Sequence, residues 1–434
     1  MKVRSMNLIN FRCFEETTVN FNEHYNVFVG NNGAGKSTIL DALAIGVGSF
    51  LSGFSAVKGS TIHIEDATYK TTKLGSRIEW SYKFPVEISI NGEIMSENMI
   101  WKRSLNGIGR RTTYGDAKNI ISVASRLQDE IKQDDIDTIL PIIAYYGTGR
   151  LWMQKKQKRV VPSKSKKWNR LDGYQDCLDV ASNEKLMMNW FMAMTFIQLQ
   201  ENETVPELEA VKNAMETYYK NSNPNIEEVN IRYSVKNSEM EIIVRNNQGK
   251  VDVLPLKSLS DGIKSTISMV GDIAYRMAVL NPQLLNNILT TPGVIMIDEI
   301  DMHLHPEWQK KIIHDLTTIF PNAQFFFTTH SPSVLANVES KHVQILEEHQ
   351  IYPPSRNTYG SNVDEILIEV MKSDVKPQDI SSLIEQFDEE IDNHNLKKAK
   401  DILNKMVTKL GENNSDVIKA QIEIDLLEMD DDIL

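Results

Sequence analysis

The chain has 434 residues, of which 41% are hydrophobic and 24% are charged, a balance typical of soluble globular proteins. No apolar run approaches the roughly eighteen residues that cross a membrane, and the N-terminus lacks the apolar core of a signal peptide. The two cysteines, Cys13 and Cys177, lie far apart, which argues against a disulfide framework or a cysteine metal site. We therefore expect a protein of the reducing cytoplasm with no membrane partner.

The first third of the chain is predicted to be rich in β-structure. Its predicted elements are strands over residues 3–9, 18–21 and 25–29, followed by a helix over 37–45. Residues 78–101 then alternate in polarity around Asn91-Gly92, a dipeptide that favours a hairpin turn.

The middle of the chain is predicted to be helical first and then mixed. A mostly helical pattern from 116 to 219 is interrupted by a basic loop at 154–167. Strands over 231–235 and 240–244 and a helix over 261–280 follow, and then strands over 294–297 and 325–328. The last two strands are apolar on both faces, which predicts a sheet covered by helices on both sides.

The end of the chain, from Gln378 onward, is predicted to form a small helical domain. Apolar residues recur there at helical spacing in three stripes. The stripes are Ile380, Leu383, Ile384, Phe387 and Ile391; Leu396, Ala399, Leu403, Met406 and Leu410; and Val417, Ala420, Ile424 and Leu427.

Charge is unevenly spread along the chain, whose formal net charge is −12. Residues 150–170 contain nine Lys or Arg and no acidic residue, whereas residues 411–434 contain eight acidic residues and one lysine. Such a chain is not a general nucleic-acid coat, but its basic stretch can form a local site for a polyanion.

A glycine-rich segment between the third strand and the first helix matches the pattern G-x-x-x-x-G-K-[ST], which begins here at Gly30. In that pattern backbone amides surround a phosphate, Lys36 reaches the β and γ oxygens, and the Ser37 hydroxyl binds Mg²⁺. A chance match in a glycine-containing turn is the alternative, but the flanking strand and helix argue against it. The predicted ATP-binding residues are Asn31, Asn32, Gly33, Ala34, Gly35, Lys36, Ser37 and Thr38.

Two acids end the buried strand at 294–297, and a histidine ends the strand at 325–328. Asp298 is predicted to hold Mg²⁺, and Glu299 to orient the attacking water or accept its proton. His330, thirty-one positions after Glu299, is predicted to reach the γ-phosphate. Each of these side chains has a plainer interpretation: acids where a strand leaves the core, and a histidine that packs or caps.

His303 and His305 also invite a metal site, because two imidazoles in an H-x-H pattern point to one side of a strand. Pro306 follows at once, and a turn that positions the neighbouring backbone explains the segment as well.

The segment Leu259-Ser260-Asp261-Gly262-Ile263 places a polar cap and a glycine at the start of a helix. An ordinary capped helix is one interpretation. In the order phosphate loop, LSDGI, DEIDMHLHP and TTHSP, however, the chain resembles the ABC-type ATPases, in particular their soluble SMC/RecF-like branch, whose signature usually reads LSGGQ.

The resemblance implies an α/β fold, an ABC-type P-loop ATPase head with a mixed sheet flanked by helices and an N-terminal antiparallel part. It also implies two heads that face each other, so that Ser260 and Gly262 of one head cap the γ-phosphate held by the other. Arg12, in the segment LINFR, matches an arginine that contacts nucleotide phosphates in this family. The family's glutamine loop is not identifiable; Gln128 is a weak candidate.

PIIAYYGTGRL at 141–151, YQDCLD at 174–179 and the helical tail resemble the PtuA family, ATPase subunits of Septu-type anti-phage systems that are sometimes found with retrons. The resemblance implies a homodimer or larger assembly, regulation of a separate HNH nuclease (PtuB) that degrades DNA, and contact with that nuclease through the C-terminal helices. A retron reverse transcriptase with its RNA–DNA hybrid is a further possible partner. No nuclease site is expected in this chain itself.

Four parts of the chain are predicted. They are an N-terminal ATPase lobe at 1–115, a helical insertion at 116–225 with a basic loop at 150–170, a C-terminal ATPase lobe at 226–350, and a helical partner-binding domain at 351–434.

DNA contact is predicted for the basic stretch, although a solvated loop explains it equally well. The residues are Lys155, Lys156, Lys158, Arg159, Lys164, Lys166 and Lys167. The alternative functions are a SMC/RecF-like repair ATPase that clamps DNA without a dedicated nuclease, and a transporter motor. The insertion of about 220 residues between the phosphate loop and the signature argues against the transporter.

Overall fold

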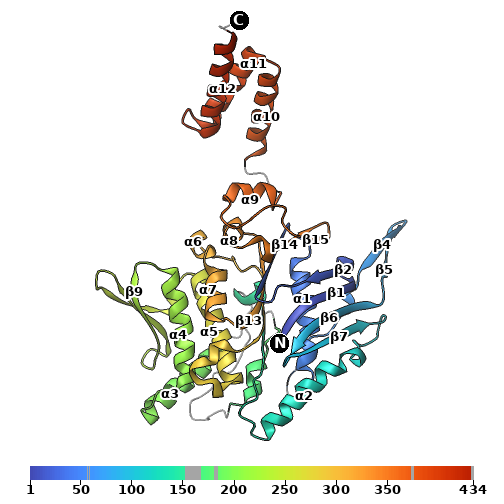
Figure 1. Cartoon of the computed structure of the whole chain (residues 1–434), viewed down its shortest axis with the longest axis vertical. Helices are drawn as coiled ribbons and strands as arrows, with labels where there is room; N and C mark the ends of the chain where they lie inside the picture. The colour runs from blue at the N-terminus through green and yellow to red at the C-terminus, as the bar shows by residue number, and fades with distance from the viewer. Residues whose placement is uncertain (56, 58, 152–167, 180–183, 373–375, 432–434) are drawn as a thin grey trace. The chain divides into compact units, whose positions relative to one another are not determined.

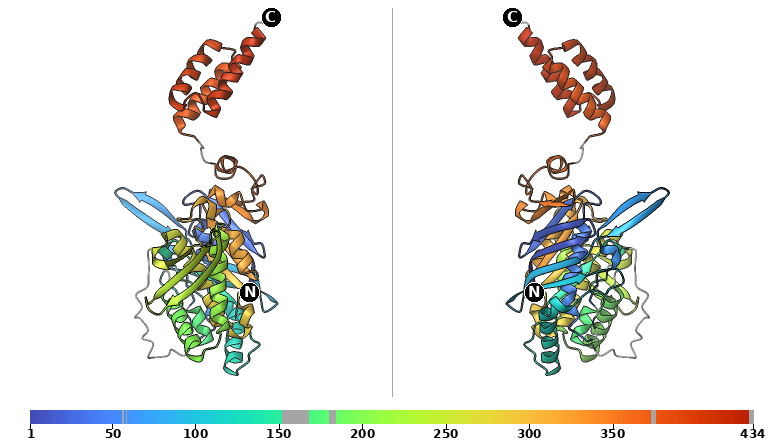
Figure 2. Two further views of the ribbon diagram at one scale, coloured as in Figure 1. Left: turned by 90° about the vertical axis from the view of Figure 1, so that its left-hand side faces the viewer. Right: turned by 90° about the vertical axis from the view of Figure 1, so that its right-hand side faces the viewer.

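A computed structural model describes residues 1–55, 57, 59–151, 168–179, 184–372 and 376–431 of the 434-residue chain. The chain separates into two compact units, Met1–Ser361 and Asn362–Leu434, which are described separately below. Figure 1 gives the labels of the helices and strands, and Figure 2 shows the same ribbon from two sides.

The core of the first unit is a six-stranded sheet with the strand order β15-β14-β3-β13-β12-β8. Its strands are β3 (Tyr25–Gly30), β8 (Ile142–Tyr146), β12 (Gly293–Ile297), β13 (Ala323–Thr329), β14 (Val343–Glu347) and β15 (Gln350–Tyr352). Only the pairing of β15 with β14 is antiparallel. Every residue of β12 and β13 is buried, which confirms the prediction that these strands are covered on both faces.

Helices cover both faces of this sheet, as two successive tyrosines of β8 show. The Tyr145 hydroxyl donates to Asp41 on α1 (Lys36–Leu51), and the Tyr146 hydroxyl donates to Asp272 on α5 (Asp261–Leu280), each at 2.7 Å. Successive residues of a strand point to opposite faces, so α1 and α5 lie on opposite sides of the sheet.

The opposite side of α1 is covered by a four-stranded antiparallel sheet with the order β2-β1-β6-β7. Its strands are β1 (Lys2–Phe11), β2 (Phe14–Asn20), β6 (Val86–Ile94) and β7 (Glu97–Leu105). The antiparallel N-terminal part expected from the sequence is therefore present, as is the mixed sheet flanked by helices.

The predicted hairpin turn at Asn91-Gly92 is wrong. Both residues lie inside β6, and the turn to β7 falls at Met95 and Ser96, which have φ values of 50° and 64°. The alternating burial of β6 continues as far as Ile94, which holds the strand in register beyond the dipeptide. Glycine is needed at 92 because a Cβ there would lie 2.5 Å from the carbonyl oxygen of Lys2 on β1.

The segment 116–225, predicted to be a helical insertion, also supplies one strand of the central sheet. It contains the helices α2 (Lys118–Lys132), α3 (Glu184–Glu201) and α4 (Pro206–Ser222), but β8 within it pairs in parallel with β12. The apolar run of β8 is short, and its parallel partner is about 150 residues away in sequence, so the helical pattern around it conceals the strand.

Two smaller sheets and several short helices complete the first unit. They are β4 (Tyr69–Leu74) with β5 (Arg77–Tyr82); β9 (Ile226–Ser234), β10 (Glu239–Asn246) and the unpredicted β11 (Val251–Pro255); and α6 (Pro306–Gln309), α7 (Ile312–Ile319) and α8 (Pro332–Leu335).

The second unit consists of α9 (Val363–Glu369), α10 (Gln378–Asp392), α11 (Leu396–Leu410) and α12 (Ser415–Asp431). The last three helices share a core drawn from the predicted stripes, which includes Phe387, Ala399, Met406 and Ile424. Among the described helices of the whole chain, none is long and apolar enough to cross a membrane.

Candidate nucleotide-binding site

The predicted phosphate loop connects β3 to α1 at the carboxyl edge of the central sheet. Gly35 is the N-cap of α1 with φ 106°, and a Cβ there would lie 2.7 Å from the Phe14 ring and 2.9 Å from the Cys13 sulfur. The N-cap residue of α1 is a glycine and so has no side chain to cap the first turn. The amide end of a long helix is thus left for an anion, as this loop pattern requires.

Lys36 is buried at the start of α1, with 6% of its surface exposed. Its ammonium donates to the carbonyl oxygens of Gly30 at 2.8 Å and Asn31 at 3.1 Å, and it forms no ion pair within 4.0 Å among the described residues. Burial lowers the pKa of Lys36, whereas the carboxylates of the acidic loop (residues 298–301) act in the opposite direction. The geometry is that of a cation held beside the loop and available to a phosphate.

The side chains of the remaining loop residues differ in their exposure to solvent. Asn31, Asn32, Gly33 and Ser37 are exposed, whereas Ala34 and Thr38 are buried. The Thr38 hydroxyl interacts with the Cys13 thiol, where it counteracts the rise in the thiol's pKa that burial causes. Thr38 therefore has a partner inside the protein, and its predicted contact with ATP stays a prediction.

Asp298 and Glu299 follow β12 and are organised by one hydroxyl of the neighbouring strand. The Thr328 hydroxyl donates to Asp298 Oδ1 at 2.5 Å and accepts the backbone N–H of Glu299 at 2.7 Å. Asp298 is buried, and its own N–H donates to the carbonyl of Tyr146 on β8 at 2.9 Å. The backbone of Glu299 has φ 48°, so the chain bends sharply where the two acids leave the sheet.

His330 follows β13, beside the acidic loop. Burial, and after it the charge of Lys36, lowers the pKa of His330, and the acidic loop partly offsets both effects. The electrostatic coupling places His330, Lys36 and the acidic loop in one cluster. These are residues that the sequence predicted to act together.

Asp301 is a member of this cluster that the sequence reasoning missed. Its carboxylate accepts from the Thr329 hydroxyl at 2.6 Å and from the backbone N–H of His330 at 3.4 Å. The signal was present as a third acid in Asp298-Glu299-Ile300-Asp301, two residues after the predicted pair.

The donor atoms at this edge fit a nucleotide carried with Mg²⁺. The Ser37 hydroxyl and the Asp298 carboxylate are hard oxygen ligands. Within the described residues, no group of three or more His, Cys, Asp or Glu side chains could hold a metal ion by itself. Mg²⁺ commonly takes only one or two carboxylates from the protein and the rest of its ligands from phosphates and water, so this set is sufficient.

Arg12, predicted to contact the nucleotide, is anchored by two acids of its own lobe. Its guanidinium forms ion pairs with Asp41 of α1 at 2.5 Å and with Asp66 at 2.9 Å. Burial lowers the pKa of Arg12, but the two carboxylates together outweigh burial, so the pKa is raised overall. Tyr145 donates to the other oxygen of Asp41, so the arginine is tied to the edge strand β8.

The signature segment begins α5, and the structure distinguishes its serine from its glycine. Ser260 is the exposed N-cap residue, and its side chain makes no capping hydrogen bond to the helix. Gly262 is buried, and a Cβ there would lie 2.0 Å from the carbonyl oxygen of His303. A close contact within the same chain therefore already requires glycine at 262, whereas the Ser260 hydroxyl is left at the surface.

A buried ion pair continues from α5 toward the sheet. Arg276 donates to Asp272 at 2.7 Å, and the same carboxylate oxygen accepts from Tyr146 of β8. Arg276 also donates to the carbonyl oxygens of Gly173 and Gln175, each at 2.9 Å. The signature helix is thus connected through Tyr146 to the strand whose carbonyl holds Asp298.

His303 and His305 are accounted for by the turn that they form. His303 has φ 60° and contacts Gly262 through its backbone. The Nδ1 atom of His305 accepts the N–H of Glu307 and so caps α6, which begins at Pro306. These contacts agree with the alternative in which the segment positions the backbone.

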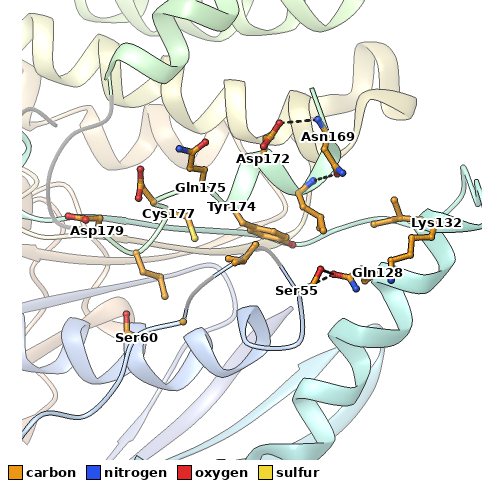
Figure 3. A pocket seen from close by; sticks show the side chains of 16 residues that line it. Ser55, Ser60, Gln128, Lys132, Asn169, Asp172, Tyr174, Gln175, Cys177 and Asp179 are labelled. Atoms are coloured by element: carbon orange, nitrogen blue, oxygen red, sulfur yellow. Dashed lines mark hydrogen bonds between the residues drawn. The ribbon is translucent and has the colours of Figure 1, made fainter. Parts of the chain in front are cut away.

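Gln128, the weak candidate for the glutamine loop, lies in a separate cavity of about 750 Å³ (Figure 3). Its side-chain oxygen accepts from the N–H and the hydroxyl of Ser55, at 2.8 and 3.0 Å. Gln128 therefore ties α2 to the segment after α1. The predicted DNA-contacting residues, Lys155, Lys156, Lys158, Arg159, Lys164, Lys166 and Lys167, lie outside the described residues.

Comparisons with known proteins show what this chain is similar to. An AAA domain family model matches residues 5–223, and a second AAA domain model matches residues 157–336. The retron Vc95 probable ATPase of Vibrio cholerae serotype O1 biovar El Tor is 26% identical over 443 residues, covering 89% of this chain and 83% of that protein. The retron Ec83 probable ATPase of Escherichia coli is 25% identical over 421 residues, covering 83% and 74%.

A shorter match and a structural similarity accompany these relatives. The Septu protein PtuA of Bacillus thuringiensis is 31% identical over 226 residues, covering 48% of this chain and 54% of that protein. The SMC head domain from Thermotoga maritima has a TM-score of 0.43 at 14% identity, covering 81% of this chain and 99% of that chain.

The fold and the site define a P-loop ATPase head, with the phosphate loop, the acidic strand and the histidine strand at one edge of a sheet. Because the first family model spans half of the chain, the protein belongs to the AAA domain family. It is an ABC-type ATPase related to retron ATPases and to PtuA.

Proposed function

We propose that two copies of this chain hydrolyse ATP between them and that hydrolysis regulates an associated HNH nuclease in anti-phage defence. The observation that carries the shared site is the exposed Ser260 hydroxyl, which starts a 20-residue helix without capping it. A helix end that carries partial positive charge and a hydroxyl without a partner among the described residues suits a phosphate presented by another molecule.

The residues of one chain divide the remaining work. The amides at the start of α1 and the Lys36 ammonium bind the β and γ phosphates. Ser37 and Asp298 hold Mg²⁺, which when bound supplies positive charge to the phosphate oxygens. Glu299 orients the attacking water and accepts its proton, and His330, which follows β13 beside the acidic loop, hydrogen-bonds the γ-phosphate.

The nuclease partnership is supported by the relatives and by the second unit. This chain is similar to two retron ATPases over 89% and 83% of its length and to a PtuA protein over 48%. On α12, Ile418, Ile422 and Leu426 are 48%, 52% and 57% exposed at one-turn spacing. An apolar stripe that the unit leaves uncovered fits the proposed docking of an HNH nuclease on the C-terminal helices.

The nucleic-acid part of the proposal is that the nuclease degrades DNA and that the basic stretch holds it. A retron reverse transcriptase with its RNA–DNA hybrid would be a further polyanionic partner. Cations clustered in residues 150–170 are suited to phosphate backbones of either kind.

The test of the shared site uses the Glu299→Gln variant, which should bind ATP and hydrolyse it slowly. Its mass in solution is measured by light scattering with and without ATP and Mg²⁺. We expect a dimer that depends on ATP, lost in a Glu299→Gln, Ser260→Ala double variant. The matched control replaces Ser258, also exposed, whose hydroxyl donates to the Pro255 carbonyl at 2.7 Å. A monomer under all conditions would refute the shared site.

The nuclease partnership is tested by co-purification of the product of the neighbouring gene. Replacing Ile418, Ile422 and Leu426 with glutamine should release the partner while leaving the ATP-dependent dimer intact. The control replaces Ile197 and Leu199 of α3, which are 45% and 64% exposed. Retention of the partner by the triple variant would exclude α12 as the docking helix. Salt-sensitive binding of duplex DNA with no co-purifying nuclease would instead favour a repair ATPase that clamps DNA.

A further inference from the structure

The β4–β5 hairpin is an exposed ribbon that the ATPase site does not use. The two strands pair only with each other, and every residue in them is exposed except the half-buried Tyr82. Figures 1 and 2 show the ribbon projecting beyond the β1-β2-β6-β7 sheet. An isolated two-stranded hairpin is marginally stable in water, so exposed apolar side chains on such an extension call for a binding partner.

One face of the hairpin is aromatic. The strand register places Tyr69 opposite Tyr82, Thr71 opposite Trp80 and Lys73 opposite Ile78, all on the same face. The ring centroids of Tyr69 and Trp80 are 4.7 Å apart, and those of Tyr69 and Tyr82 are 6.1 Å apart. Because Tyr69 is 50% exposed and Trp80 is 52% exposed, ring surface is available to a planar ligand.

The hairpin is also basic within an acidic protein. Its strands carry Lys70, Lys73 and Arg77 against the single acid Glu79, a local charge of +2 in a chain of −12. Among the described residues, none of the three cations forms an ion pair within 4.0 Å. Lys70 lies near Glu15, but that carboxylate is already paired with Lys83 at 2.6 Å. The positive charge of the ribbon is therefore left for an external anion.

We propose that the β4–β5 hairpin binds single-stranded nucleic acid, a contact that rests on the proposed role in nucleic-acid degradation. Exposed bases stack on Tyr69 and Trp80 beside Lys73, which lies on the same face of the ribbon. The backbone crosses the edge of the ribbon, so that its phosphates reach Lys70 and Arg77 on the opposite face. Aromatic rings alternating with Lys and Arg are the combination that single strands bind without a sequence code. A protein partner could contact the apolar side chains, but it would leave the three unpaired cations without an anion.

The test measures fluorescence anisotropy of a labelled oligothymidylate with the full-length protein. The Tyr69→Ala, Trp80→Ala double variant should bind roughly 5- to 150-fold more weakly for each base that loses its stacking partner. The matched control replaces two exposed tyrosines elsewhere in the same unit, Tyr352 and Tyr359, which are 49% and 66% exposed. That control should bind as tightly as the wild type.

A second variant tests the charge contribution. Replacing Lys70, Lys73 and Arg77 with glutamine should reduce the slope of log K against log salt by about 2, because each phosphate contact to a single strand contributes roughly 0.7. Because these side chains are exposed, the variants should keep the fold, and unchanged ATP hydrolysis by the same preparations would verify this.

Several outcomes would overturn the inference. They are a wild-type protein that does not bind the oligonucleotide, hairpin variants that bind it like the wild type, and equally tight hairpin-dependent binding of a duplex. Loss of the nuclease partner with unchanged oligonucleotide binding would assign the ribbon to a protein contact instead. If the wild type lacks ATPase activity but binds the oligonucleotide through the hairpin, the proposed ATP-driven function fails while this inference stands.

Discussion

Replacing Thr328 with valine tests whether one hydroxyl organises both acids of the site. The side chain is fully buried, donates to Asp298 and accepts from the backbone of Glu299. Valine has nearly the same shape, so the change removes two hydrogen bonds without creating a cavity. A hydrogen bond to a charged group contributes about 1.5–3 kcal/mol, and a buried N–H left without a partner costs about 1–3 kcal/mol. We therefore expect a loss of about 2.5–6 kcal/mol in the free energy of unfolding.

The effect of Thr328→Val on activity should be at least as informative as its effect on stability. Side chains that orient a metal-binding carboxylate typically change metal affinity or activity by roughly 10- to 100-fold. The assay is steady-state ATP hydrolysis over a range of Mg²⁺ concentrations, combined with urea unfolding. Thr328→Ser should restore most of the activity because it keeps the hydroxyl.

The matched control for Thr328 is Thr317→Val on α7. The Thr317 hydroxyl donates within its own helix, to the carbonyls of Ile313 and His314, and is remote from the acids in the hydrogen-bond network. A Thr328→Val protein with wild-type hydrolysis and wild-type Mg²⁺ dependence would refute the reasoning. So would an equal loss in the Thr317→Val protein.

Three further predictions concern His330, Gly262 of the signature segment, and the buried ion pair between Arg276 and Asp272. The pKa of His330 lies below 6.5 in the free protein, and bound phosphate should raise it; ATP binding should therefore take up a proton. ATP affinity measured by calorimetry should rise as the pH falls through the pKa of His330 in the complex, and this rise should be absent in His330→Gln. An identical pH profile in the variant would contradict the prediction. Gly262→Ala drives a methyl group into the His303 carbonyl, so thermal unfolding should show a loss of about 1–3 kcal/mol, and an unchanged melting temperature would contradict the close contact. Asp272→Ala leaves buried Arg276 without its carboxylate and should lower the free energy of unfolding in urea by about 3–5 kcal/mol. The loss should be smaller in an Asp272→Ala, Arg276→Met double variant, which removes both charges.

The position of the site's motifs at one edge of the sheet was largely predictable because each motif is local. The glycines and Lys36 lie within eight consecutive residues, and the loop conformation follows from where glycine permits a positive φ. Fully apolar strands ending in Asp298 and His330 predict neighbouring strands in a covered sheet, and such strands bring their carboxyl ends to one edge. The residues in these motifs could therefore be predicted without knowing which distant segments they contact.

Contacts between distant segments were decided by the tertiary structure alone. Asn91-Gly92 has the composition of a turn, but pairing with β1 and continued burial on β6 extend the strand past it. The residues of β8 resemble part of a helical segment until β12 supplies a parallel partner. Arg12 and Asp41 are separated by 29 residues, and Tyr145 and Asp41 by 104, so no local pattern connects them.

The sequence by itself predicted which residues form the candidate nucleotide site, because the backbone geometry of a phosphate loop and of a strand end depends on neighbouring residues. Only the folded chain decided how those residues are supported, for example that Thr328 serves both Asp298 and Glu299 and that Gly262 packs on His303. Hydrogen bonds and close contacts of this kind depend on the lateral packing of strands and helices. Packing is a property of the whole core, and it cannot be read from the spacing of residues along one segment.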